Sequence, residues 1–79
     1  MDIKTLDQLK IGERGRVLKL DNQGTIRRRL LDIGLTPGTL VECTLESPFH
    51  DPVAYRIRNA NIALRKEDSK LIQIEVVEF

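Results

Sequence analysis

Several features that would point directly to a function are scarce or missing in this chain. The 79 residues include one cysteine, so no internal disulfide can form, which fits a reducing compartment such as the cytosol. Tryptophan is absent and aromatic residues make up only 4%, so stacking platforms for single-stranded nucleic acid are few. Lysine and arginine number 13 against 12 aspartate and glutamate, and the net charge of +1 lacks the basic excess of a nucleic-acid binder. We therefore expect no nucleic-acid partner.

Long hydrophobic runs are also missing. The longest segment without a charge, 33–41, contains a proline and two glycines, whereas a membrane-spanning helix needs about 20 apolar residues. The N-terminal segment carries Asp2 and Asp7 and has no apolar region of the kind found in signal peptides. We expect a complete cytoplasmic chain with no direct insertion into a membrane.

Catalytic motifs are equally scarce. No G-x-x-x-x-G-K-[ST] loop is present, so the chain lacks the P-loop that binds nucleotide phosphates. With a single histidine, no local pattern marks a nucleophile together with a base and an orienting group. The sequence therefore predicts a protein that is not an enzyme.

Three residues have side chains that could bind a transition metal: Cys43, His50 and Asp51. Their chemistry would suit Fe(II) or Zn. No C-x-x-C or H-x-x-x-H pair accompanies them, and Cys43 lies on the apolar face of a predicted strand, where a free cysteine usually packs in the core. We expect no tightly bound cofactor and keep a weak Fe(II) or Zn site at these residues as an alternative.

The residues that are present predict a small, mainly β domain. A chain that is 41% hydrophobic and 32% charged can form one core, and its length allows one domain, residues 1–79. Periodicity predicts a helix over 25–34 and about five short strands, at 14–20, 39–46, 53–58, 62–64 and 71–77. Exposed sheet edges are costly, so we expect the strands to curl into a small barrel, with segment 21–38 crossing between the first two strands and covering one mouth.

Alternation and turn residues add local detail. In the strand 39–46, Val41, Cys43 and Leu45 share one face, whereas the alternation of 14–20 is imperfect and leaves its buried face undecided. Turn conformations are predicted at several positions, where glycine or asparagine accepts a positive φ or proline presets φ. These positions are Gly34 as a helix C-cap, Pro37 and Gly38 in a type II turn, Asp51 and Pro52 in the turn 47–52, and Asn59 in a hairpin.

Two blocks of the chain resemble the ferrous-iron transport protein A (FeoA) family. Residues 31–39, LDIGLTPGT, match the family signature L-x-x-L-G-L-x-P-G. Residues 51–58, DPVAYRIR, followed by IALRK at 62–66, match the second block, which reads roughly G-D-P-x-x-Y-x-V-R-G-x-x-I-A-L-R. The chain departs from this pattern at His50 and Asn59, where the family usually has glycine.

This resemblance implies an SH3-like β-barrel and a role in ferrous iron uptake. Members of the family are cytoplasmic and are thought to assist FeoB, a membrane transporter with a G-domain. The resemblance therefore implies a non-enzymatic adaptor that binds such a transporter. Similar domains occur in iron-dependent repressors, so a regulator-associated module or a metal-sensing domain remains the alternative.

The sharpest surface feature is the triplet Arg27, Arg28 and Arg29 on the predicted helix. It can be a solvated helix face, a docking surface for acidic side chains of a partner, or the source of an arginine finger for a partner GTPase. Leu31 and Leu35 either fill the core or, where the barrel leaves them uncovered, contact a partner or a second copy of the chain. Phe49, in the proline-rich turn, is a further candidate contact.

Overall fold

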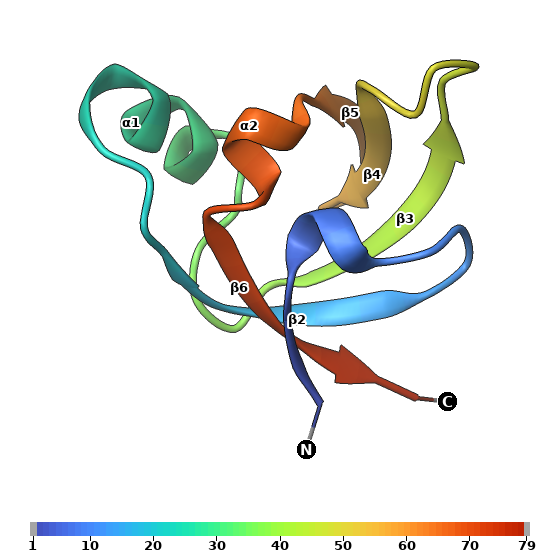
Figure 1. The fold of residues 1–79 in the computed structure, drawn as a ribbon. Helices are drawn as coiled ribbons and strands as arrows, with labels where there is room; N and C mark the ends of the chain where they lie inside the picture. The colour runs from blue at the N-terminus through green and yellow to red at the C-terminus, as the bar shows by residue number, and fades with distance from the viewer. Residues whose placement is uncertain (1, 79) are drawn as a thin grey trace.

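A six-stranded antiparallel sheet and three short helical segments make up residues 2–78, the part of the chain that the computed structural model describes (Figure 1). The elements are β1 (Ile3–Thr5), the 3-10 turn η1 (Leu6–Gln8), β2 (Arg14–Leu20), α1 (Gly24–Asp32), β3 (Leu40–Glu46), β4 (Val53–Ile57), β5 (Ala60–Leu64), α2 (Lys66–Ser69) and β6 (Ile72–Val77). The mainly β fold class with one longer helix is confirmed.

The sheet differs from the expected barrel in two respects. It contains β1 in addition to the five predicted strands, because Ile3–Thr5 pairs with β6. The strand order is β1-β6-β2-β3-β4-β5, so β1 and β5 form its two ends and the hydrogen-bonded ladder of the described residues is curved but not closed. An open ladder leaves one edge of β5 without a strand partner.

Two irregularities in register explain which strand residues are buried. In β2 the pairing shifts between Val17 and Lys19, and the extra residue lets both Val17 and Leu20 face the core, which strict alternation would forbid. In β3 the pairing shifts between Cys43 and Leu45, so Leu45 turns outward and is 65% exposed. The expectation that Leu45 shares the buried face of Val41 and Cys43 is therefore wrong beyond Cys43.

Helix α1 is one residue longer at its start and two shorter at its end than the predicted 25–34. Its C-terminus forms a Schellman motif, in which the Leu35 amide donates to the Leu30 carbonyl and the Gly34 amide to the Leu31 carbonyl, both at 3.0 Å. Gly34 has a φ of 108°, as a glycine C-cap requires. This confirms the predicted cap and returns Leu35 to the core beside Leu30.

The predicted turns at Gly38 and Asn59 also form. The Thr39 amide donates to the Thr36 carbonyl at 3.0 Å across Pro37 and Gly38, with Gly38 at a φ of 93°. Between β4 and β5 the chain reverses over Arg58 and Asn59, whose φ values of 49° and 69° are both positive, as in a type I′ hairpin. Asn59 is therefore a turn residue as predicted, and its partner in the turn is Arg58.

The core lies inside the curved sheet and is apolar. Its buried hydrophobic residues are Leu6, Leu9, Val17, Leu20, Leu30, Leu35, Val41, Cys43, Val53, Tyr55, Ile57, Leu64, Ile72 and Ile74. The hydroxyl of Tyr55 donates to the Leu6 carbonyl at 3.3 Å, so the one polar atom of this side chain is bonded inside the core. Burial raises the pKa of both Tyr55 and the Cys43 thiol.

These two pKa shifts predict a loss of stability in alkali. Both groups stay neutral in the folded core, whereas in the unfolded chain the thiol and the phenol ionise near their ordinary values of 9.0 and 10.0. The unfolded chain then binds fewer protons, so the contribution of these two groups to the free energy of unfolding is constant below about pH 8 and falls above it, by up to about 1.4 kcal/mol per pH unit for each group. Urea unfolding at a series of pH values measures this. In Tyr55→Phe the decrease above pH 10 should weaken, and an unchanged slope would contradict the assignment.

Candidate functional site

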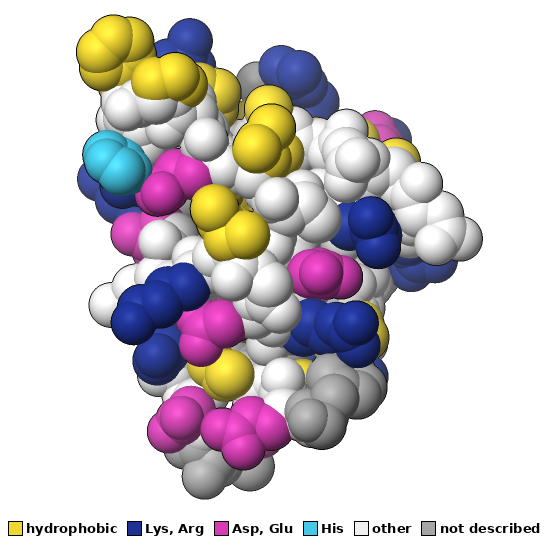
Figure 2. Space-filling view, turned by 90° about the vertical axis from the view of Figure 1, so that its right-hand side faces the viewer, with side chains coloured by type: hydrophobic (Ala, Val, Ile, Leu, Met, Phe, Trp, Pro, Cys, Tyr) yellow, Lys and Arg dark blue, Asp and Glu magenta, His cyan; other side chains and the backbone are white. Residues whose placement is uncertain are grey.

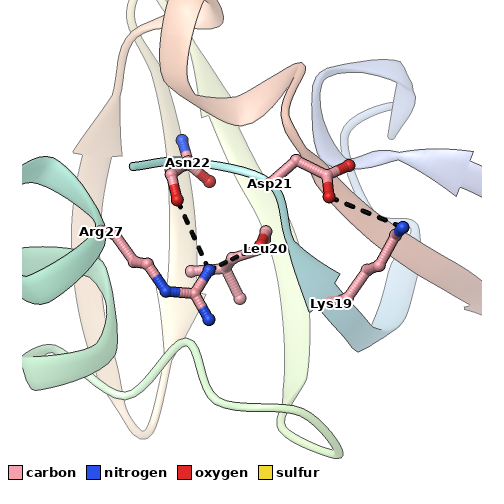
Figure 3. Close-up of polar contacts among 5 residues, drawn as sticks. All are labelled: Lys19, Leu20, Asp21, Asn22 and Arg27. Carbon is pink, nitrogen blue, oxygen red and sulfur yellow. Dashed lines mark hydrogen bonds and ion pairs between the residues drawn. The ribbon is translucent and has the colours of Figure 1, made fainter. Parts of the chain in front are cut away.

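The three arginines of α1 have different surroundings. Arg27 turns back toward β2, where its Nη1 donates to the carbonyls of Leu20 at 2.6 Å and Asn22 at 3.5 Å (Figure 3). Asn22 is buried, and its side-chain amide donates to the Asp68 carbonyl of α2 at 3.0 Å. Arg27 therefore joins α1 to the end of β2. Only its Nη1 is bonded in this way and the residue is exposed, so a role of Arg27 in binding a partner stays a prediction.

Arg28 and Arg29 are exposed and form no ion pair or side-chain hydrogen bond with any residue in 2–78. Their charges are therefore not neutralised by the domain itself. An unpaired guanidinium presents a planar fork of donors that matches a carboxylate. Of the three predicted arginines, Arg28 and Arg29 are therefore the stronger candidate contacts for an acidic partner.

A groove lies next to these arginines, between α1 and β5, and is called the α1–β5 groove below. Ile26 and Arg29 of α1 line one side and Ile62 and Ala63 of β5 line the other, and Arg65, directly before α2, and Asp68 of α2 also belong to the lining. Its volume is about 310 Å³. This is at the lower limit for small-molecule pockets, so the groove suits side chains of a larger partner better than an enclosed metabolite.

Leu31 and Leu35, which the sequence treated alike, differ in the structure. Leu35 has 0% exposure and belongs to the core, so the prediction that it contacts a partner is corrected. Leu31 is half-buried and packs against the core from outside. The difference follows from the Schellman motif, which folds the residue after Gly34 inward and leaves the last turn of α1 partly at the surface.

Arg58 has a positioning role that the sequence analysis missed. From the β4–β5 hairpin its Nε donates to the Gly34 carbonyl at 3.4 Å, and its Nη2 lies 3.3 Å from the Thr36 hydroxyl and 3.4 Å from that of Thr39. These bonds hold the hairpin against the C-terminus of α1, and so connect the two sides of the α1–β5 groove. The sequence signals are a basic residue directly before the turn asparagine and the arginine at the same place in the second family block.

The turn 47–52 contains an exposed hydrophobic residue. Phe49 is 87% exposed, and Leu45 at the end of β3 and Ile11 are 65% and 60% exposed. Figure 2 shows hydrophobic side chains on this face, with the histidine beside acidic side chains. The Asp51 carboxylate accepts the Lys66 amide at 3.0 Å, which attaches the turn to the first turn of α2. Asp51, followed by Pro52, therefore has a structural role in fixing this turn against α2.

The predicted metal ligands lie in different environments. Cys43 is 2% exposed, and burial raises the pKa of its thiol, which disfavours the thiolate that binds metals. His50 and Asp51 are exposed in the turn, and His50 Nδ1 lies 3.1 Å from a Glu46 carboxylate oxygen. Among residues 2–78, no three histidine, cysteine, aspartate or glutamate side chains are grouped to hold a metal ion. A weak Fe(II) or Zn site remains a prediction.

The helices of the described segment are all too short or too polar to cross a membrane.

Comparison with known proteins gives a family match along most of the chain. The family described as "FeoA domain" matches residues 4–76. A relative from Porphyromonas gingivalis, described as a fusion of Fe(2+) transport protein A with the Fe(2+) transporter FeoB, is 35% identical over 75 residues. That match covers 91% of this chain and 8% of the relative, so the chain spans only a small part of the fusion protein.

Solved structures show the same fold. The solution structure of iron(II) transport protein A from Clostridium thermocellum is 36% identical, with a TM-score of 0.88 over 92% of this chain and 45% of that one. The crystal structure of Stenotrophomonas maltophilia FeoA with zinc, described as an SH3 domain protein, is 23% identical, with a TM-score of 0.80 over 90% of this chain and 88% of that one. The second likeness is one of fold, and it agrees with the expected SH3-like class.

Proposed function

The chain belongs to the FeoA domain family, and on that premise we propose that it is a cytoplasmic accessory protein of ferrous iron uptake that acts by binding a FeoB-type transporter. The family consists of small SH3-like domains and is not a family of enzymes. The fusion of the two proteins in the P. gingivalis relative carries the proposal. Domains that work together on one polypeptide have a high effective concentration for each other, which also makes a weak contact effective.

Features of the surface support a role in binding. Arg28 and Arg29 are exposed without a charged partner among residues 2–78, and Arg29 lines the α1–β5 groove. Charges of this kind attract and orient a partner of opposite charge. In this proposal iron is the cargo of the transporter, and the chain itself need not hold it.

Reversing the two exposed arginine charges should weaken binding to the transporter. We expect Arg28→Glu combined with Arg29→Glu to lower the affinity of the purified protein for its detergent-solubilised transporter by about tenfold. The reason is that two exposed guanidinium groups are replaced by carboxylates, which repel an acidic partner. Capture on an affinity resin at increasing salt measures the effect. The urea midpoint should change little, because both side chains project from the fold.

The matched control is Lys10→Glu combined with Lys70→Glu, which changes the net charge by the same amount at exposed residues outside the groove lining. This control should bind as the unmodified protein does. An equal loss in both variants would show a general charge effect and reject the α1 surface. If the unmodified protein fails to bind the transporter at all, the proposed function is wrong.

A further inference from the structure

Within residues 2–78, strand β5 has one edge that no other strand covers. It is the last strand in the sheet order, and it pairs only with β4. In a two-residue hairpin the pair next to the turn, Ile57 and Ala60, is hydrogen-bonded, and bonding then alternates along the strands. The backbone N–H and C=O groups of Asn61 and Ala63 therefore point away from β4, toward the open side.

The groups on this edge have no partner within the described chain. Neither amide donates to a backbone or side-chain acceptor outside the ladder in residues 2–78. Ala63 is exposed and its side chain is small, so another backbone can approach closely. An uncovered edge of this kind is a template for an added strand.

The α1–β5 groove lies along the same edge and has a defined chemistry. Ile26 and Ile62 provide apolar contacts, and both pack against the core. Arg29 and Arg65 line the groove together with one acidic residue, Asp68, and Arg28 adds a further positive charge on α1. An occupant with alternating apolar and acidic side chains would complement these residues, because successive side chains of a strand point to opposite faces.

We propose that the partner binds by β-strand addition: an extended acidic segment pairs with the free edge of β5, through Asn61 and Ala63, and fills the α1–β5 groove. This inference rests on the proposed function and identifies how the transporter would be held. Main-chain hydrogen bonds to β5 supply the part of the affinity that does not depend on the partner's side chains. The arginines select a segment with acidic side chains. Helices α1 and α2 and strand β5 lie at the end of the molecule away from the start of β1 and the end of β6 (Figure 1), so a fusion like that of the P. gingivalis relative would leave the groove accessible.

The other open edge, β1, is less suited to this role. It has three residues, and the Thr5 amide already donates to the Gln8 side chain at 3.1 Å. None of the β1 residues lines the α1–β5 groove. The β1 edge can therefore serve as the control for the β5 edge within the same protein.

Amide hydrogen exchange in the complex tests the proposal. The protein is exchanged alone and bound to its detergent-solubilised transporter, with residue-level detection at β5 and β1. We expect the Asn61 and Ala63 amides to exchange at least about tenfold more slowly in the complex, while the β1 amides do not change. If the complex forms and both β5 amides exchange as in the free protein, or if β1 is protected in their place, strand addition to β5 is wrong although the proposed function stands. If no complex forms, both proposals fail.

A substitution on the edge gives a second measurement. Ala63→Pro removes the outward N–H without removing a hydrogen bond to β4, and proline is tolerated on edge strands for this reason. We expect it to lower transporter affinity about tenfold, whereas Ala63→Ser, which keeps the N–H, should bind normally. Equal binding by the folded proline variant would overturn the proposal. If that variant does not fold, the exchange experiment on the unmodified chain still decides the question.

Discussion

Replacing Leu35 by alanine is expected to lower the free energy of unfolding by roughly 2–5 kcal/mol. Leu35 has 0% exposure and packs in the core beside Leu30, where the Schellman motif directs it. Truncation would leave a cavity that the turn cannot fill, because Gly34 and the amide bond to Leu30 hold the backbone in place. A loss of this size is a large part of the total stability of a domain of this length. Urea unfolding followed by circular dichroism measures it.

Leu31→Ala is the matched control, because it removes the same atoms from the same helix end. Leu31 is half-buried, so we expect a loss of about 1 kcal/mol. Equal losses in the two variants would contradict the distinction between a core leucine and a surface one. The Leu31 variant can also be tested for transporter binding, since it should remain folded.

Gly34→Ala is the second large expected effect, a loss of about 2–3 kcal/mol. Gly34 has a φ of 108°, which strains any residue with a Cβ. An added Cβ would also lie 2.5 Å from Arg58 Cδ and 2.7 Å from Arg58 Nε, so the arginine would have to leave its bonds to Gly34 and Thr36. Thermal or urea unfolding measures the loss of stability.

Gly38→Ala separates the two causes of this loss. Gly38 has a φ of 93°, and an added Cβ would meet nothing within 4 Å. This variant should therefore show the backbone strain alone, about 1 kcal/mol. Combining Gly34→Ala with Arg58→Ala removes the arginine side chain that the added Cβ would meet, so the clash should disappear. If Gly34→Ala costs no more than Gly38→Ala, the packing of Arg58 over Gly34 has no energetic importance.

The contact between Arg58 and Gly34 also concerns binding. It joins the β4–β5 hairpin to the end of α1, and these elements carry the two sides of the α1–β5 groove. A variant that frees the hairpin from the helix changes the spacing of the groove without changing the residues that line it. In this chain Gly34 therefore serves both the helix cap and the close approach of Arg58.

Local patterns in the sequence predicted most elements correctly. Spacing of apolar residues located the strands and α1, since helix and strand periods differ, and glycine marked the C-cap because few other residues accept its φ. The exposed Leu45 was missed, because a bulge depends on the partner strand and leaves no mark in the alternation of its own strand. Likewise, the sequence placed three arginines together on α1, but only the position of β2 shows that Arg27 is bonded to the fold.

The amino-acid order alone determined the mainly β class, the cap at Gly34, the turn at Gly38 and the family to which the chain is similar, because each depends on neighbours within a few residues. Only the tertiary structure decided that the sheet stays open at β5, that Leu35 is buried while Leu31 is half-buried, and that Arg29 and Arg65 line a groove along the uncovered edge. These properties depend on which distant segments become neighbours. That choice is made by the free energy of the whole packed core and not by any single segment.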